Sequence, residues 1–279
     1  MTESETDARA ATLLSVITEA GREVRAFQAE PQALEVGLKG HQDFITAADG
    51  AVERLLRGRL IGAFPTDAFL GEETGRTSDQ RPGSKRPRGE RQRSQGLWVV
   101  DPIDGTANFA RGLPHFCISV ALVEGPEMLL GAILDPVLNE LYFARRGRGA
   151  TRNGCAITAS PAADLGEAAV EIGWSTRVPD ARYLDCVSRV LATGAAIRRG
   201  GSGALGLAYV ADGRQDAYAE LHINAWDCLA GLLIVREAGG RISPFLANGG
   251  LARGAPILAS APGIAAAMSE VTGIPLAPI

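Results

Sequence analysis

Short apolar segments alternate with longer helix-like segments through the second half of the chain. Strands are expected at Ala168–Gly173 and Asp216–Glu220, and helices follow near Pro179–Leu191 and Trp226–Ala238. Such alternation is typical of layered α/β structure, in which helices cover the faces of a sheet. The pattern therefore predicts an α/β architecture for the C-terminal half.

The first half has a different order of elements. Apolar residues recur at helical spacing from Thr6 to about Phe27, and a second helix is expected to end near Pro65. Antiparallel strands are expected at Phe116–Val123 and Met128–Leu134, which a short polar turn separates. Helices that precede a run of hairpins indicate an α+β arrangement in this half.

The size and composition fit these two halves. The chain has 279 residues, and a domain usually has roughly 150. Hydrophobic residues make up 46% and charged residues 22%, which excludes a disordered chain. We therefore expect an N-terminal half over residues 1–150 and a C-terminal half over residues 151–279.

The formal net charge of −4 is unevenly distributed. Residues 75–96 contain seven Lys and Arg side chains against two acids, so this segment carries +5 and the rest of the chain −9. It has almost no apolar residues and no periodicity, which predicts a mobile surface loop inserted in the N-terminal half. Such a charge run is usually only solvated, and the alternative is that residues 76–95 attract an anionic substrate or a nucleic acid.

The sequence favours a cytoplasmic protein with no membrane contact. Its first residues are acidic and polar, unlike the basic and then apolar start of a secretory signal. The apolar runs are shorter than the roughly 20 residues that a membrane span needs. The four cysteines, Cys117, Cys155, Cys186 and Cys228, lack the paired spacing of a zinc site and are expected to be reduced thiols.

Acidic residues stand where strands end. Asp101 and Asp104 follow the apolar segment Leu97–Val100, and Glu72 follows another short strand. Alone, the Asp-Pro-Ile-Asp-Gly segment would indicate a turn. Asp227, however, is a further acid in an apolar segment, where an uncompensated carboxylate is costly.

Carboxylates that converge without His or Cys partners make an all-oxygen site that suits Mg²⁺ or Mn²⁺. Gly105 and Thr106 follow the acids at the start of a turn or short helix, where free amides can receive a phosphate oxygen. A metal beside a phosphate site favours hydrolysis of a phosphate ester.

Several motifs in this order resemble the inositol monophosphatase family. They are Gly71-Glu-Glu-Thr74, the segment Trp98–Phe109, Ala225-Trp-Asp-Cys-Leu-Ala-Gly231 with Glu237-Ala-Gly-Gly240, and Asp43–Asp49 upstream. The resemblance extends from about residue 10 to residue 265. It implies a layered αβαβα sandwich with a metal site between the two halves.

The resemblance also implies roles for individual residues. Two or three Mg²⁺ ions, or Mn²⁺, would be held by Glu72, Asp101, the Ile103 carbonyl, Asp104 and Asp227, with Asp101 bridging two of them. The catalytic residues would be Asp49 and Thr106, which would orient the attacking water, together with Glu72. The substrate would be held by Gly105, Thr106, Gly201, Ser202, Gly203 and Glu220. From its position alone, Glu220 could instead be an ordinary surface acid at a strand end. Glu73 would lie on the other face of its strand and bear only on water or a weaker third metal.

A small phosphorylated metabolite is the implied substrate, with myo-inositol 1-phosphate as the leading candidate. Fructose 1,6-bisphosphate, histidinol phosphate and nucleotide or NADP phosphates stay open, because related enzymes share the metal motifs. The resemblance also implies a homodimer and lithium sensitivity. The alternative from another class is an RNA-associated regulatory protein on the same scaffold.

Two features depart from the family pattern. The segment 75–96 is longer and more basic than usual, and Gly206 stands where relatives more often carry Asp or Asn. The three histidines, His41, His115 and His222, are far apart in the sequence and are expected to be structural residues with satisfied hydrogen bonds.

Overall fold

The computed structural model describes residues 1–29, 36–40, 43–77, 96–247 and 249–278. His41 and most of the basic segment lie outside these ranges. The start of that segment is described and differs from the expected loop. Gly75–Thr77 forms strand β4, because its backbone pairs antiparallel with Ala68–Gly71 (β3).

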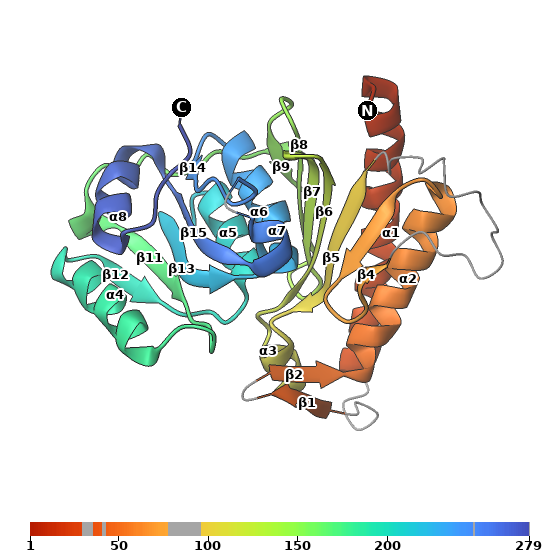
Figure 1. The fold of residues 1–279 in the computed structure, drawn as a ribbon, viewed down its shortest axis with the longest axis horizontal. Coiled ribbons are helices and arrows are strands. Elements are labelled where there is room, and N and C mark those ends of the chain that lie inside the picture. The colour runs from red at the N-terminus through yellow and green to blue at the C-terminus, as the bar shows by residue number, and fades with distance from the viewer. Residues whose placement is uncertain (30–35, 41–42, 78–95, 248, 279) are drawn as a thin grey trace.

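The predicted αβαβα sandwich is confirmed (Figure 1). Helices α1 and α2 cover the outer face of one sheet, α5 and α6 lie between the two sheets, and α4 and α8 cover the outer face of the second sheet. The helices are α1 (Glu3–Ala29), α2 (Ala47–Ala63), α3 (Thr106–Ala110), α4 (Asp180–Ala192), α5 (Gly203–Ala211), α6 (Ala225–Glu237), α7 (Gly250–Arg253) and α8 (Ala265–Thr272), with 3-10 turns η2 (Leu165–Glu167) and η3 (Pro262–Ile264).

The first sheet has eight strands in the order β10-β9-β8-β7-β6-β5-β3-β4. Only β3 and β5 are parallel neighbours among these described strands. The remaining strands are β5 (Leu97–Asp104), β6 (Cys117–Glu124), β7 (Glu127–Asp135), β8 (Glu140–Arg145), β9 (Ala150–Arg152) and β10 (Cys155–Ala156). This sheet continues to Ala156, six residues past the proposed division at residue 150, and the division stays a prediction.

The second sheet has five strands in the order β12-β11-β13-β15-β14. Its members are β11 (Ala169–Gly173), β12 (Ala196–Arg198), β13 (Ala217–Ile223), β14 (Arg241–Ile242) and β15 (Ala255–Ser260). Strand β11 runs parallel to β12 and β13, while β15 runs antiparallel to β13. The parallel strands bring the carboxyl ends of β11 and β13 to one edge.

A two-stranded ribbon, which the sequence analysis did not predict, precedes α2. Strand β1 (Val36–Gly40) pairs antiparallel with β2 (Asp43–Thr46). Figure 1 shows it beside α3, at one end of the first sheet. The motif Asp43–Asp49 is therefore a strand that leads directly into a helix.

The middle helices belong to the sequence of the second half but pack on the sheet of the first. Leu229, Leu232 and Leu233 of α6 are all 0% exposed. They share one apolar cluster with Val99 of β5 and Ile257 of β15, so this core reaches both sheets. Helix α6 shows no polar face because it is covered on all sides.

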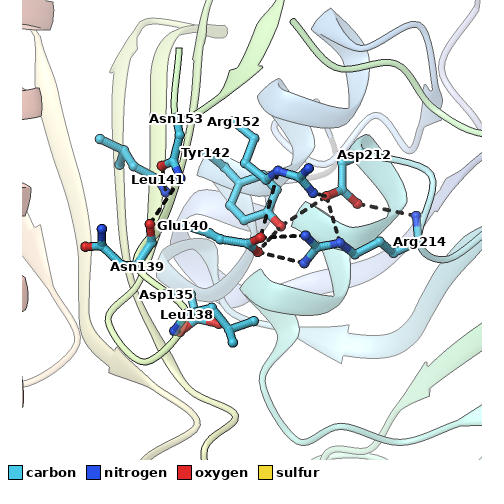
Figure 2. Close-up of polar contacts among 10 residues, drawn as sticks. All are labelled: Asp135, Leu138, Asn139, Glu140, Leu141, Tyr142, Arg152, Asn153, Asp212 and Arg214. Carbon is cyan, nitrogen blue, oxygen red and sulfur yellow. Dashed lines mark hydrogen bonds and ion pairs between the residues drawn. The ribbon is translucent and has the colours of Figure 1, made fainter. Parts of the chain in front are cut away.

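A polar network adds a second connection between the halves (Figure 2). Arg214, in the turn between α5 and β13, donates to Glu140 of β8 at 2.6 Å. Arg152 of β9 donates to Asp212 of the same turn at 2.6 Å. The Tyr142 hydroxyl lies 2.9 Å from Glu140 Oε2 and 3.1 Å from Asp212 Oδ2. Each charged group therefore faces one of opposite sign, which offsets the cost of its partial burial.

Among the described residues, no helix has the length and the apolar composition that crossing a membrane requires.

Candidate active site

Three carboxylates from the two halves of the chain lie close together. Glu72 follows β3, Asp101 lies in β5 and Asp227 is in the first turn of α6. One oxygen from each lies within 4.8 Å of the other two. An all-oxygen group of this kind could hold a divalent cation such as Mg²⁺.

The backbone places these carboxylates. Strands β3 and β5 are parallel with Gly71 opposite Val100, so the next residue of each strand, Glu72 and Asp101, reaches the same level. The Glu72 amide donates to the Val100 carbonyl at 3.1 Å. In the third carboxylate, Asp227 Oδ2 accepts from the Asn224 backbone amide at 3.2 Å, which fixes the side chain at the start of α6.

Asp101 is at the centre of the group and is 1% exposed. Burial raises its pKa well above the usual value, and repulsion from Glu72, Asp104 and Asp227 raises it further. Burial also raises the pKa of Asp227. A bound cation would favour the charged form of each carboxyl, so the donor set fits a metal centre.

Asp104 does not belong to the group of three. Its Oδ2 atom accepts hydrogen bonds from Ser202 Oγ at 2.6 Å and from the Ala204 amide at 2.7 Å. Burial raises the pKa of Asp104, and these hydrogen bonds counteract that rise. The start of α5 thus holds Asp104 on a neighbouring wall of the same cavity, which has a volume of about 720 Å³.

Asp49 and Thr106 are brought together although 57 residues separate them. Thr106 Oγ1 lies 3.3 Å from Asp49 Oδ1 and 2.8 Å from the Ile103 carbonyl oxygen. The hydroxyl has one proton for these two acceptors. Asp49 is 0% exposed, and its Oδ2 accepts from the Thr46 amide at 2.7 Å, so its position is fixed.

Gly105 and Thr106 form the start of α3 and line the cavity. Gly105 has a φ of 93°, in the left-handed region that favours glycine. A Cβ atom there would lie 3.0 Å from the His115 carbonyl oxygen. Glycine thus allows the backbone to turn sharply beside the acids.

The expected substrate residues lie on the wall contributed by the second half. Gly201, Ser202, Gly203 and Glu220 all line the cavity. Glu220 is 8% exposed, so the alternative of a surface acid is wrong. Burial raises the pKa of Glu220 to about 7, although the Tyr218 hydroxyl donates to it at 2.6 Å.

Two polar residues that support the site were missed in the sequence analysis. Glu53 of α2 is 1% exposed, and its carboxylate accepts from the amides of Glu73 at 2.9 Å and Thr74 at 3.0 Å. It fixes the turn that follows Glu72. The sequence did indicate that Glu53 is buried, because it stands four residues after Asp49 on the apolar face of the helix.

Asn108 of α3 is the second missed residue. Its Nδ2 atom donates to the carbonyls of His115 at 2.7 Å and Gly200 at 2.9 Å. It thereby joins α3, beside the acids, to the loop that carries Gly201 and Ser202. The sequence offered no signal for this contact, because Gly200 is 92 residues away.

Comparisons with known proteins agree with this geometry. The sequence model of the inositol monophosphatase family matches residues 5–272. An inositol-1-monophosphatase of Rhizobium meliloti is 38% identical over 266 residues, which cover 95% of this chain and 96% of the relative.

Other relatives have a different name. A Nus factor SuhB of Xylella fastidiosa is 40% identical over 216 residues, 77% of this chain and 74% of the relative. Among solved structures, the extragenic suppressor protein suhB of Bartonella henselae has a TM-score of 0.83 and 31% identity, and the match covers 94% of this chain and 97% of that one.

Proposed function

Because the chain belongs to the inositol monophosphatase family, we propose that it is a Mg²⁺-dependent phosphomonoesterase that hydrolyses a small polyol or sugar phosphate. The observation that carries this proposal is the meeting of Glu72, Asp101 and Asp227 oxygens within 4.8 Å. Carboxylates so close together, one of them buried, are costly without a cation.

Glu72, Asp101 and Asp227 would hold the cation, with Asp101 as the buried central ligand. The Ile103 carbonyl and Asp104, which line the same cavity, would complete a set for two or three Mg²⁺ or Mn²⁺ ions. When bound, these ions supply an activated water and stabilise the oxygen of the leaving group.

The chain itself would orient the reactants. Thr106 Oγ1 has two acceptors and one proton, so its remaining lone pair can accept from a water while Asp49 fixes the direction of the hydroxyl. The amides of Gly105 and Thr106 would hold the phosphate. Glu220 and the segment Gly201–Gly203 would contact the hydroxyl groups of the polyol, because they line the same cavity.

For the substrate, we propose myo-inositol 1-phosphate first. The relative named inositol-1-monophosphatase, 38% identical over nearly the whole of both chains, supports this choice. Fructose 1,6-bisphosphate, histidinol phosphate and nucleotide or NADP phosphates are the alternatives.

Phosphate release from each of these compounds, measured with and without Mg²⁺, tests the proposal. We expect Mg²⁺-dependent release, fastest from myo-inositol 1-phosphate. Absence of release from every compound would reject phosphatase activity, whereas a different preferred compound would reject only the substrate.

A second candidate function is an RNA-associated regulatory role. Its support is the name Nus factor SuhB of relatives that are 35% to 40% identical. The basic residues 76–95 would supply the contact, although residues 78–95 lie outside the described ranges. RNA retention in a salt titration should weaken in a chain that lacks residues 76–95, and equal retention by both chains would reject this contact.

We further propose that the enzyme works in the cytoplasm as a homodimer and that Li⁺ inhibits it, as the family suggests. Sedimentation of the purified chain and a Li⁺ titration of phosphate release test the last two points. A monomer, or activity that Li⁺ leaves unchanged, would contradict them separately.

A further inference from the structure

A buried carboxylate holds the turn that begins at Glu72. Glu53 of α2 is 1% exposed, and its two oxygens accept separately from the backbone amides of Glu73 at 2.9 Å and Thr74 at 3.0 Å. The Glu72 amide donates to the Val100 carbonyl of β5 at 3.1 Å. Three consecutive amides of this turn are therefore fixed by other elements, and Glu53 supplies two of the three acceptors.

Gly71 makes room for this contact. A Cβ atom on Gly71 would clash with the carboxylate of Glu53. The close approach of carboxylate and backbone thus requires glycine at the position before Glu72. A larger residue there would displace the end of the Glu53 side chain, because Gly71 itself is paired with Val100 in the sheet and cannot move as easily.

Helix α2, which carries Glu53, is fixed against the strands that lead to the acids. Its residues Val52 and Leu56 are 0% exposed, and they share one apolar cluster with Phe69 of β3 and Val100 of β5. The helix therefore cannot shift without disturbing this core. The position of the Glu53 carboxylate relative to both strands is set by that packing.

The same helix carries Asp49 one turn before Glu53. Asp49 is 0% exposed, and its Oδ1 atom lies 3.3 Å from Thr106 Oγ1. Side chains four residues apart lie on the same side of a helix. One face of α2 therefore holds both the hydroxyl of Thr106 and the turn that carries Glu72, so a single rigid element sets their relative positions.

We propose that Glu53 is a positioning residue, which holds Glu72 in the arrangement that binds the divalent cation. The cation would contact Glu72, whereas the Glu53 oxygens are directed at backbone amides. Loss of a group that orients a metal ligand typically lowers metal affinity by about 10- to 100-fold. This inference deepens the proposed function and rests on it, because it concerns the cation of the active site.

Calorimetric titration of the wild type and Glu53→Gln with MgCl₂ tests the role. Glutamine has nearly the same size, but its side-chain NH₂ group would face a backbone N–H in place of one acceptor oxygen. We expect the dissociation constant for Mg²⁺ to rise about tenfold or more.

The matched control is Asp216→Asn, which also exchanges a carboxylate for an amide. Asp216 Oδ2 accepts from the Ala169 backbone amide at 2.7 Å, just before β13, and Asp216 does not line the active-site cavity. Its Mg²⁺ affinity should equal that of the wild type. Circular dichroism of each variant without metal establishes that it is folded under the conditions of the titration.

Gly71→Ala provides a second variant that leaves Glu53 in the chain. It should raise the Mg²⁺ dissociation constant as Glu53→Gln does, since the added methyl group displaces the carboxylate. In a chain that already carries Glu53→Ala, the same substitution should add little further loss, because the group with which it clashes is gone.

Phosphate release separates positioning from a general loss of structure. In Glu53→Gln, the Mg²⁺ concentration for half-maximal rate should rise by the same factor as the dissociation constant, while kcat and KM at saturating Mg²⁺ stay close to the wild-type values. A kcat that stays low at every Mg²⁺ concentration would overturn the proposal, because a misplaced metal ligand should be compensated by more metal.

The remaining outcomes distinguish this role from the proposed function. Equal Mg²⁺ affinity of the wild type and Glu53→Gln would overturn the role of Glu53 and leave the phosphatase intact. If Glu53→Gln does not fold, equal affinity of the wild type and Gly71→Ala would overturn it. Weaker Mg²⁺ binding by the variants, with no phosphate release by the wild type, would support the role and reject the phosphatase. Absence of Mg²⁺ binding by the wild type would overturn both.

Discussion

Two regions that line the active-site cavity hold buried carboxylates in opposite surroundings. On one side, Glu72, Asp101 and Asp227 repel one another. On the other, Glu171 is 2% exposed, and its two oxygens accept from the Gly200 amide at 2.7 Å and from the Gln215 side-chain amide at 2.9 Å.

The acids of the first region face like charges and suit a cation, whereas the carboxylate of Glu171 faces hydrogen-bond donors. The predictions below test this contrast.

Removal of the central negative charge should have the largest effect. Asp101→Asn is expected to lower kcat/KM by about 10³-fold or more, because the carboxylate that would bridge the cations is lost. The metal-free protein should keep its thermal stability or gain some, because repulsion with Glu72 and Asp227 is relieved. Steady-state kinetics and thermal unfolding measure the two effects. Near-normal activity would refute the role of Asp101.

Addition of Mg²⁺ should stabilise the protein. A cation that binds only the folded state contributes about 2.7 kcal/mol at 100 times its dissociation constant. Unfolding in denaturant, with NaCl of equal ionic strength as the control, measures this gain. The gain should be much smaller in Asp101→Asn, and an equal gain in both proteins would place the cation elsewhere.

Loss of the Glu171 carboxylate should weaken the fold. Glu171→Ala leaves the amides of Gly200 and Gln215 without acceptors, so the free energy of unfolding should fall by about 1–3 kcal/mol. Glu171→Gln retains one acceptor oxygen and should lose less. Denaturant unfolding of the wild type and the two variants checks this order of stability. Equal stability of all three would show that Glu171 does not contribute to the free energy of unfolding.

The pH dependence of the unfolding free energy should include a contribution from Glu220. The pKa of Glu220 is raised from 4.5 to about 7 in the folded protein, so folding favours its protonated form. This contribution is complete below pH 4.5 and is lost as the pH rises through about 7, at roughly 1.4 kcal/mol for each unit of pKa difference.

Glu220→Gln should therefore reduce the decline in stability of the metal-free protein between pH 4.5 and 7. The decline should not vanish, because burial also raises the pKa of Asp101 and Asp227. Unfolding free energies measured across this range test the point, and an unchanged slope would contradict the assignment.

Much of the fold follows from local sequence. The strand expected at Ala168–Gly173 is observed as β11 (Ala169–Gly173), and the strand expected at Phe116–Val123 is observed as β6 (Cys117–Glu124). Periodicity and turn chemistry act within a few residues, so they can be read directly. The ribbon of β1 and β2 was missed, because strands of five and four residues show too little periodicity to be recognised in the sequence.

The sequence alone predicted only part of the site. Motifs predicted which acids would gather, but they did not indicate that Asp104 is held apart by Ser202 and Ala204 at the start of α5. The roles of Glu53 and Asn108 depend on contacts between distant segments, which no local pattern encodes. A cavity lined by His115, Arg198 and Gln215 was missed for the same reason, since these residues meet only in the folded chain.

The position of α6 has a consequence for dividing this protein. A fragment that ends at residue 150 would expose to water the sheet face that α5 and α6 cover, and it would separate Glu140 from Arg214. The remaining fragment would carry α6, whose residues Cys228–Val235 are all buried, without one of the two sheets that enclose it. Neither piece would be a self-sufficient protein, so the polypeptide must be synthesised well past its middle before the first sheet can be enclosed.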